Sequence, residues 1–204
     1  MAKRNKSETE KQKRIENFNI RRETMAEQGY SYDICTISII RANLMAFVTA
    51  GPFALLAAVF YRNRWGGIEF EYNFSGYLLF LLLIIISIPL HEFLHGFTWH
   101  FFCKDKWKSI HFGIIVEMAT PYCHCKEPLS YKAYILGSLM PFFILGIGVT
   151  LPGILVHNEL FFAVGIINIL SAGGDTTIVG MSFKYHGGML LDHPTECGFA
   201  AFMK

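Results

Sequence analysis

The sequence predicts an all-α integral membrane protein with about four transmembrane helices and a small cytoplasmic β-hairpin between the second and third. Two observations support this fold class. Hydrophobic residues make up 52% of the 204 residues and charged residues only 17%, with a mean hydropathy of +0.35, which is too apolar for an ordinary soluble domain. The apolar residues are also concentrated in four stretches, and a helix of about 20 residues is enough to cross a bilayer.

The four predicted spans cover residues 42–61, 76–102, 134–156 and 160–183. Arg41 and Arg62 bound the first span, the second is rich in Leu and Ile, and the third contains two prolines. Only residues 157–159 separate the third span from the fourth. We therefore expect these two helices to form a tight antiparallel hairpin.

The residues before the first span predict a basic arm. Residues 1–41 contain nine Lys/Arg and six Asp/Glu with few large apolar side chains, so they cannot bury much surface. We expect a cytoplasmic arm or surface helix here, followed by one membrane domain over residues 42–204. Because the basic residues directly precede a span, they indicate anchoring at an anionic lipid leaflet and not binding to nucleic acid.

The distribution of Lys and Arg predicts the orientation in the membrane. The arm has nine, segment 103–133 has five, and the tail has Lys184 and Lys204. Segment 62–75 has two and segment 157–159 has none. By the positive-inside rule, the N-terminus, the middle segment and the C-terminus face the cytoplasm, as in a multi-pass protein of the cell membrane.

The segment between the second and third spans has a pattern of its own. Apolar residues alternate with others from Ser109 to Glu117, which is the periodicity of a strand. Residues 119–121 indicate a turn, and a second short strand is expected from Tyr122 to Cys125. A small hairpin at the cytoplasmic face is the prediction.

The second span contains the polar motif His91-Glu92-Phe93-Leu94-His95. On a helix, a spacing of four places His91 and His95 on one face, close enough to bind a single zinc ion. Glu92 would project beside that ion and could take a proton from a bound water. Each charged residue in an apolar helix costs about 2.5–3.5 kcal/mol on insertion scales, which a buried functional site would explain. The alternative reading is a structural polar cluster or a proton path.

Two histidines leave zinc short of protein ligands, and Asp175 in the fourth span is the expected third ligand. His91 and Asp175 each lie 15 residues inward from the outer end of their spans, so both are about 22 Å deep. Asn168 shares a helix face with Asp175 and is expected to hydrogen-bond a substrate or a developing oxyanion. Asp192 or His193 in the tail remains an alternative third ligand.

The five cysteines do not indicate a disulfide framework, because their number is odd and no CxxC pair occurs. The run Cys123-His124-Cys125 could suggest a second zinc site. On a strand, however, the two thiols share one face and the imidazole lies on the other. A zinc site there would need Cys103 or Cys197 as a further ligand, and we expect instead a hairpin with free thiols.

These motifs resemble a bacterial domain-of-unknown-function family of membrane zincin peptidases. The resemblance runs from about residue 76 to the C-terminus and depends on PLHEFLHG, TPYCHCKEPL, the Gly174-Asp175 pair and LLDHPTECGF. It implies a zinc-binding membrane peptidase. Site-2 proteases are similar more distantly, with HExxH in one membrane helix and an Asn and an Asp-Gly pair in a later one. Here Thr176 follows Asp175, and the prolines of that later motif are missing.

The sequence therefore predicts a zinc metallopeptidase with His91, His95 and Asp175 as metal ligands and Glu92 and Asn168 as catalytic residues. The expected partners are the lipid bilayer, Zn²⁺ and a peptide or membrane-protein substrate, which the predicted hairpin could hold by strand addition. Two alternatives remain open. One is a membrane transporter or metal-handling protein that uses the same polar cluster, and the other is a catalytically silent regulatory module. The substrate and the oligomeric state are not predicted.

Overall fold

The apolar stretches form long helices in the computed structural model, which describes residues 2–67, 73–115 and 120–204. Among these residues, three helices are long and apolar enough to cross a membrane, or four if one bent pair counts as a single span. The first is Ile39–Trp65, made of α2 (Ile39–Thr49) and α3 (Gly51–Trp65), and the second is α4 (Phe74–Trp99). The third is Tyr131–Leu155, made of α5 (Tyr131–Pro141), the π-helical η3 (Phe142–Ile147) and α6 (Gly148–Leu155). The bent pair is α7 (Glu159–Ser171) and α8 (Gly173–Ser182), followed by the 3₁₀ turn η4 (Phe183–Tyr185).

Polar side chains cap the first turn of four of these helices. Ser38, Asn73, Ser130 and Asn158 cap α2, α4, α5 and α7, each by accepting a backbone N–H from the first turn. The turn between α6 and α7 falls at the predicted place, and these two helices pack very closely. A Cβ at Gly153 would lie 2.4 Å from the backbone nitrogen of Phe162. The expected tight hairpin of helices is confirmed.

A four-stranded antiparallel sheet corrects the expectation of an all-α fold. Its order is β1-β6-β5-β4, and its strands are β1 (Ser31–Ile37), β6 (Cys197–Met203), β5 (Met189–Asp192) and β4 (Leu129–Ser130). Sequence patterns missed it for two physical reasons. Most of β6 is buried on both faces, so its residues do not alternate between apolar and polar. Its partner β1 is far away in the sequence, with Ser31 opposite Met203.

The predicted β-hairpin is confirmed as a second, two-stranded sheet. Strand β2 (Ile110–Ile115) follows the short 3₁₀ helix η1 (Lys106–Ser109) and pairs antiparallel with β3 (Thr120–Cys125). Thr120 and Pro121, expected in the turn, belong to β3. The remaining turn residue, Ala119, lies outside the described residues.

The basic N-terminal segment contains a helix, α1 (Ala2–Glu27), that packs on the four-stranded sheet. Phe18 and Met25 are buried against Leu191, Ala200 and Phe202 of β5 and β6. The expected surface helix is therefore present, and β1 follows it directly into the sheet.

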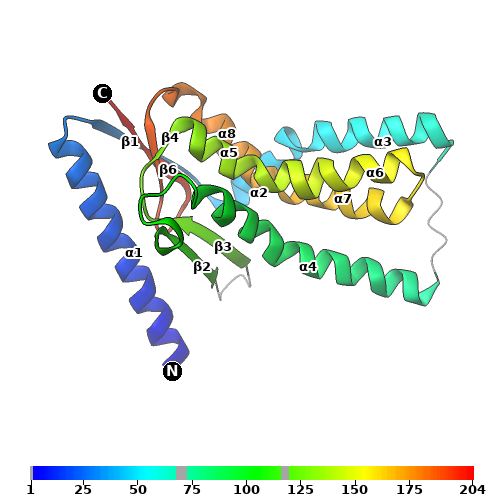
Figure 1. Cartoon of the computed structure of the whole chain (residues 1–204), viewed down its shortest axis with the longest axis horizontal. Helices are drawn as coiled ribbons and strands as arrows, with labels where there is room; N and C mark the ends of the chain where they lie inside the picture. The colour runs from blue at the N-terminus through cyan, green and yellow to red at the C-terminus, as the bar shows by residue number, and fades with distance from the viewer. Residues whose placement is uncertain (1, 68–72, 116–119) are drawn as a thin grey trace.

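Figure 1 shows how these parts are arranged. Helices α3, α6 and α7 run side by side in the right half, and α4 runs from the centre to the lower right and diverges from them, while α1, both sheets and both termini lie in the left half. Helices α5 and α8 lie where the two halves meet. The arm, the hairpin and the tail thus share one end of the helix bundle.

Candidate metal centre

Helix α4 provides two imidazoles from one of its faces. His91 and His95 lie one helical turn apart, and their ring centroids are 4.9 Å apart. The His95 side chain is buried and that of His91 is nearly so. The spacing of four residues therefore brings the two side chains together as expected.

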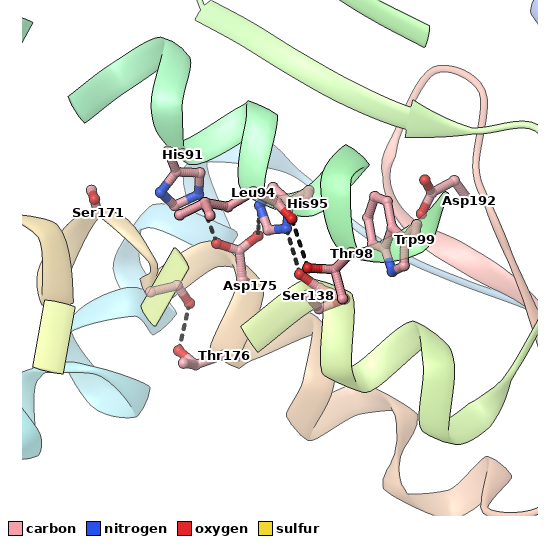
Figure 2. A network of polar contacts seen from close by, with 12 residues as sticks. His91, Leu94, His95, Thr98, Trp99, Ser138, Ser171, Asp175, Thr176 and Asp192 are labelled. Carbon is pink, nitrogen blue, oxygen red and sulfur yellow. Dashed lines mark hydrogen bonds and ion pairs between the residues drawn. The ribbon is translucent and has the colours of Figure 1, made fainter. Parts of the chain in front are cut away.

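A bend between α7 and α8 brings an acid to this pair. The helix axis turns by 40° at Ala172, and Gly173 lies so close to α2 that a Cβ there would be 2.2 Å from the Ala46 Cβ. Asp175 follows in the first turn of α8. Its Oδ2 lies 3.1 Å from Nε2 of His91, and its Oδ1 lies 3.4 Å from Nε2 of His95 (Figure 2).

These three side chains fit a metal ion. Their donor atoms, two imidazole nitrogens and a carboxylate oxygen, all lie within 4.8 Å of one another. Atoms that each bind a tetrahedral Zn²⁺ at about 2.0–2.2 Å are separated by roughly 3.3–3.6 Å, close to the two measured contacts. Two nitrogens and one oxygen are also the ligand types of catalytic zinc sites, which leave one position open.

The surroundings of His95 fix the orientation of its ring. Its Nδ1 lies 2.9 Å from the carbonyl oxygen of Gly137 in α5, and its ring stacks on Trp99 with centroids 5.3 Å apart. Because a carbonyl only accepts, Nδ1 carries a proton, and Nε2 is the ring nitrogen that faces Asp175. Only a residue without a Cβ fits at position 137, since a Cβ would lie 2.1 Å from Nε1 of Trp99.

Glu92 lies next to the candidate metal ligands and beside the hairpin. Its carboxylate is close enough to His91, His95 and Asp175 for their charges to interact, and it lies near the backbone N–H of Cys123 in β3. Strand β3 therefore lies directly beside the motif. Hydrophobic patterns predicted the hairpin but not this contact with α4.

Asn168 lies in α7 beside an apolar groove that leads along α4. The groove has a volume of about 260 Å³, and its lining includes Ser87 and Leu90 of α4. Asn168 is buried, and its Nδ2 donates to the carbonyl of Val164, so its own helix engages one of its two N–H bonds. Its expected contact with a substrate stays a prediction.

The alternative third ligands in the tail have other partners. Asp192 accepts hydrogen bonds from the Tyr134 hydroxyl at 2.7 Å and from the Cys125 N–H at 2.8 Å. Burial raises the pKa of its carboxyl to about 6. In His193, Nδ1 accepts from the Glu196 N–H. Asp192 thus ties β5 to α5 and β3 on the far side of Trp99, as Figure 2 shows.

Two buried cysteines lie close together, but they are not part of a group of residues with metal-ligand spacing among the described residues. Cys103 and Cys125 are buried with their Sγ atoms 3.4 Å apart, and the described cysteines are free. Burial lowers the pKa of His124 to about 3, so the 3.9 Å contact between His124 and Asp192 involves a neutral imidazole. Among the described residues, only His91, His95 and Asp175 form a group with metal-ligand spacing.

Sequence reasoning missed three groups around the ligands. They are the carbonyl of Gly137, the ring of Trp99 and the backbone N–H of Cys123. Two of them are backbone atoms, which leave no trace in the residue type. The third, Trp99, lies one turn after His95 on the same helix face, a position from which a large ring could have been expected to touch it.

This geometry defines a candidate metal centre of the zincin class, set in a chain whose helices are compatible with a membrane protein. The chain belongs to the family described as "Putative zincin peptidase", whose model matches residues 84–186, half of the chain. The matched part contains His91, Glu92, His95, Asn168 and Asp175. No curated protein and no solved structure gives a significant match.

Proposed function

We propose that the protein is a zinc-dependent membrane metallopeptidase that hydrolyses peptide bonds near the cytoplasmic face of the membrane. The observation that supports this most is the meeting of His91, His95 and Asp175 from two helices, with Glu92 beside them. Membership in a zincin peptidase family supports both the metal and the reaction.

Each residue has a distinct role in this proposal. His91, His95 and Asp175 hold the ion, which when bound polarises the scissile carbonyl and lowers the pKa of the attacking water. The Glu92 carboxylate takes a proton from that water and delivers it to the leaving amine. The Gly137 carbonyl keeps the proton of His95 on Nδ1, so that Nε2 stays available as a ligand.

The hairpin is the proposed site for the substrate backbone. Strand β3 lies against Glu92 through Cys123, and an extended peptide could pair with the two-stranded sheet. An unfolded peptide or a segment of a membrane protein fits this mode. The basic arm, the hairpin and the tail lie at one end of the bundle, and the positive-inside rule makes that end cytoplasmic.

Metal analysis and hydrolysis, measured on the same purified variants, test the proposal. Wild type should contain about one zinc per chain and cleave fluorescein-labelled casein. Glu92→Gln should keep the zinc and lose hydrolysis, whereas His91→Ala and Asp175→Ala should lose both. Exposed His186→Ala is the matched control and should change neither.

Three results would argue against this function. Protein purified without zinc, and unable to take it up, would remove the metal centre. Zinc retained fully by Asp175→Ala would exclude that residue as a ligand. Hydrolysis retained by Glu92→Gln would exclude the proposed base. If that variant kept peptide cleavage and lost metal transport, the protein would instead be a metal-handling protein.

A further inference from the structure

A row of exposed aromatic side chains lies on the face of α4 opposite the metal ligands and on the segment that follows. We call it the aromatic ridge, and it consists of Phe93, Phe97, Phe101, Trp107 and Phe112. Each of these side chains is 41–57% exposed. The rings of Phe93, Phe97, Phe101 and Trp107 touch one another, with centroids 6.0 Å apart for Phe93 and Trp107 and 5.2 Å apart for Phe97 and Phe101. Phe112 of β2 lies against α4 where Gly96 leaves room for its ring.

The ridge continues the exposed apolar surface of α4. Leu82 is 52% exposed and lies three helical turns before Phe93, hence on the same face. Leu78 and Ile85 are also exposed. Since this part of α4 is apolar enough to cross a membrane, the ridge marks the place where a lipid-exposed surface ends.

The residue types change at that place from aliphatic to aromatic and basic. Lys104, Lys106 and Lys108 are exposed around Trp107, and with Asp105 they give residues 104–108 a net charge of +2. The Trp107 ring stacks on buried His100, with centroids 4.2 Å apart, which holds the indole in place. Aromatic rings beside lysines at the end of an apolar helix are typical of the headgroup layer of a bilayer.

We propose that the aromatic ridge, together with Lys104, Lys106 and Lys108, is a lipid-binding surface that lies in the headgroup layer of an anionic leaflet. The lysines contact lipid phosphates, and the rings lie at the boundary with the acyl chains. Phe93 stands between His91 and His95 in the sequence, so this surface also fixes the depth of the metal centre at that boundary. A peptide bond that reaches Glu92 would then lie at the membrane surface and not at the bilayer midplane.

This inference rests on the membrane placement in the proposed function but not on hydrolysis, so the two can fail separately. The protein has three tryptophans, and Trp65→Phe/Trp99→Phe leaves Trp107 alone. This variant is reconstituted in vesicles of phosphatidylcholine or phosphatidylglycerol that carry bromine close to the headgroup or deep in the acyl chain. Bromine near the headgroup should remove about half of the Trp107 emission, deep bromine should remove less, and aqueous acrylamide should have little effect.

The lysines are tested by the type of lipid. Brominated phosphatidylglycerol should quench Trp107 more than brominated phosphatidylcholine, and Lys104→Gln/Lys108→Gln should remove the difference. The matched control is Lys11→Gln/Lys13→Gln in α1, which removes two charges elsewhere and should keep the difference. If the double tryptophan variant does not fold, subtracting the signal of Trp107→Phe from that of wild type gives the same quantity.

Two outcomes would overturn the inference. Quenching of Trp107 by acrylamide with no response to brominated lipid would mean that the ridge faces water. Protection from both quenchers would mean that a second copy or another protein covers it. His91→Ala in the same background should give unchanged quenching, which separates this result from any failure of the peptidase proposal.

Discussion

Replacing Gly137 by alanine should weaken zinc binding without touching any metal ligand. A Cβ at this position would lie 2.1 Å from Nε1 and 2.2 Å from Cδ1 of Trp99, and real Cβ contacts are essentially never below 3.0 Å. The indole cannot swing into solvent, because Trp99 is 4% exposed and its Nε1 donates to the carbonyl of Tyr134 at 3.2 Å. Either the Trp99 ring that stacks on His95 must move, or the carbonyl that binds His95 Nδ1 must move.

The size of the effect follows from these two contacts. Overpacking a buried site typically costs about 1–3 kcal/mol of stability. Losing a group that orients a metal-binding histidine typically lowers metal affinity by about 10–100-fold. We therefore expect Gly137→Ala to bind zinc at least about tenfold more weakly and to unfold at a lower temperature.

Competition with a zinc chelator dye in detergent measures the affinity, and circular dichroism follows unfolding. Gly180→Ala in α8 is the matched control, because nothing lies within 4 Å of a Cβ built there. Zinc affinity within about twofold of this control would refute the reasoning, since the Gly137 carbonyl and the Trp99 stack would then contribute nothing to His95.

Three further predictions concern stability. Asp192 has a pKa of about 6 when folded against an ordinary value of 3.8, so the folded state binds the extra proton and wild type should lose stability as pH rises from about 4 to 7. The stability lost through this group is about 3 kcal/mol. Thermal unfolding of Asp192→Asn over the same pH range should show a smaller decrease of stability with pH than wild type. The same decrease in both proteins would contradict the prediction. Phe18→Ala should cost about 3–5 kcal/mol and expose α1 to proteolysis, because Phe18 packs on Leu191, and unchanged protection would mean that α1 does not rest on the sheet. Gly153→Ala should lower the unfolding temperature sharply, because its Cβ would meet the backbone of Phe162, which cannot rotate away, and a stability equal to that of Gly180→Ala would argue against the close helix packing.

The long apolar helices and the hairpin could be predicted because each depends on a local pattern. Long apolar stretches indicate spans and alternation indicates strands, whatever the rest of the chain does. The four-stranded sheet depends on pairing between β1 and β6, which are separated by nearly the whole chain. The short β4 has only the two residues Leu129 and Ser130, too few to show any period.

The candidate ligand set was proposed from spacing and depth, and the structure brings its three members together. His91 and His95 are one turn apart, and Asp175 comes from a helix of matching depth. The sequence favours Asp175 over Asp192 on depth alone, and the structure adds that Asp192 binds Tyr134 and Cys125 whereas Asp175 faces both imidazoles. The bend at Ala172, which aims Asp175 at α4, also leaves no simple pattern, since small residues favour many kinds of close packing.

The pairing of β1 with β6 makes the folded state depend on how many times the chain crosses the membrane. Strand β1 precedes every candidate span and β6 follows them all. An even number of crossings delivers both strands to the same compartment, whereas one missed or additional crossing leaves them on opposite sides of the bilayer, where they cannot meet. A chain inserted with the wrong number of crossings would keep an unpaired strand edge and would leave Phe18 and Met25 of α1 uncovered, and both features make a protein prone to aggregation.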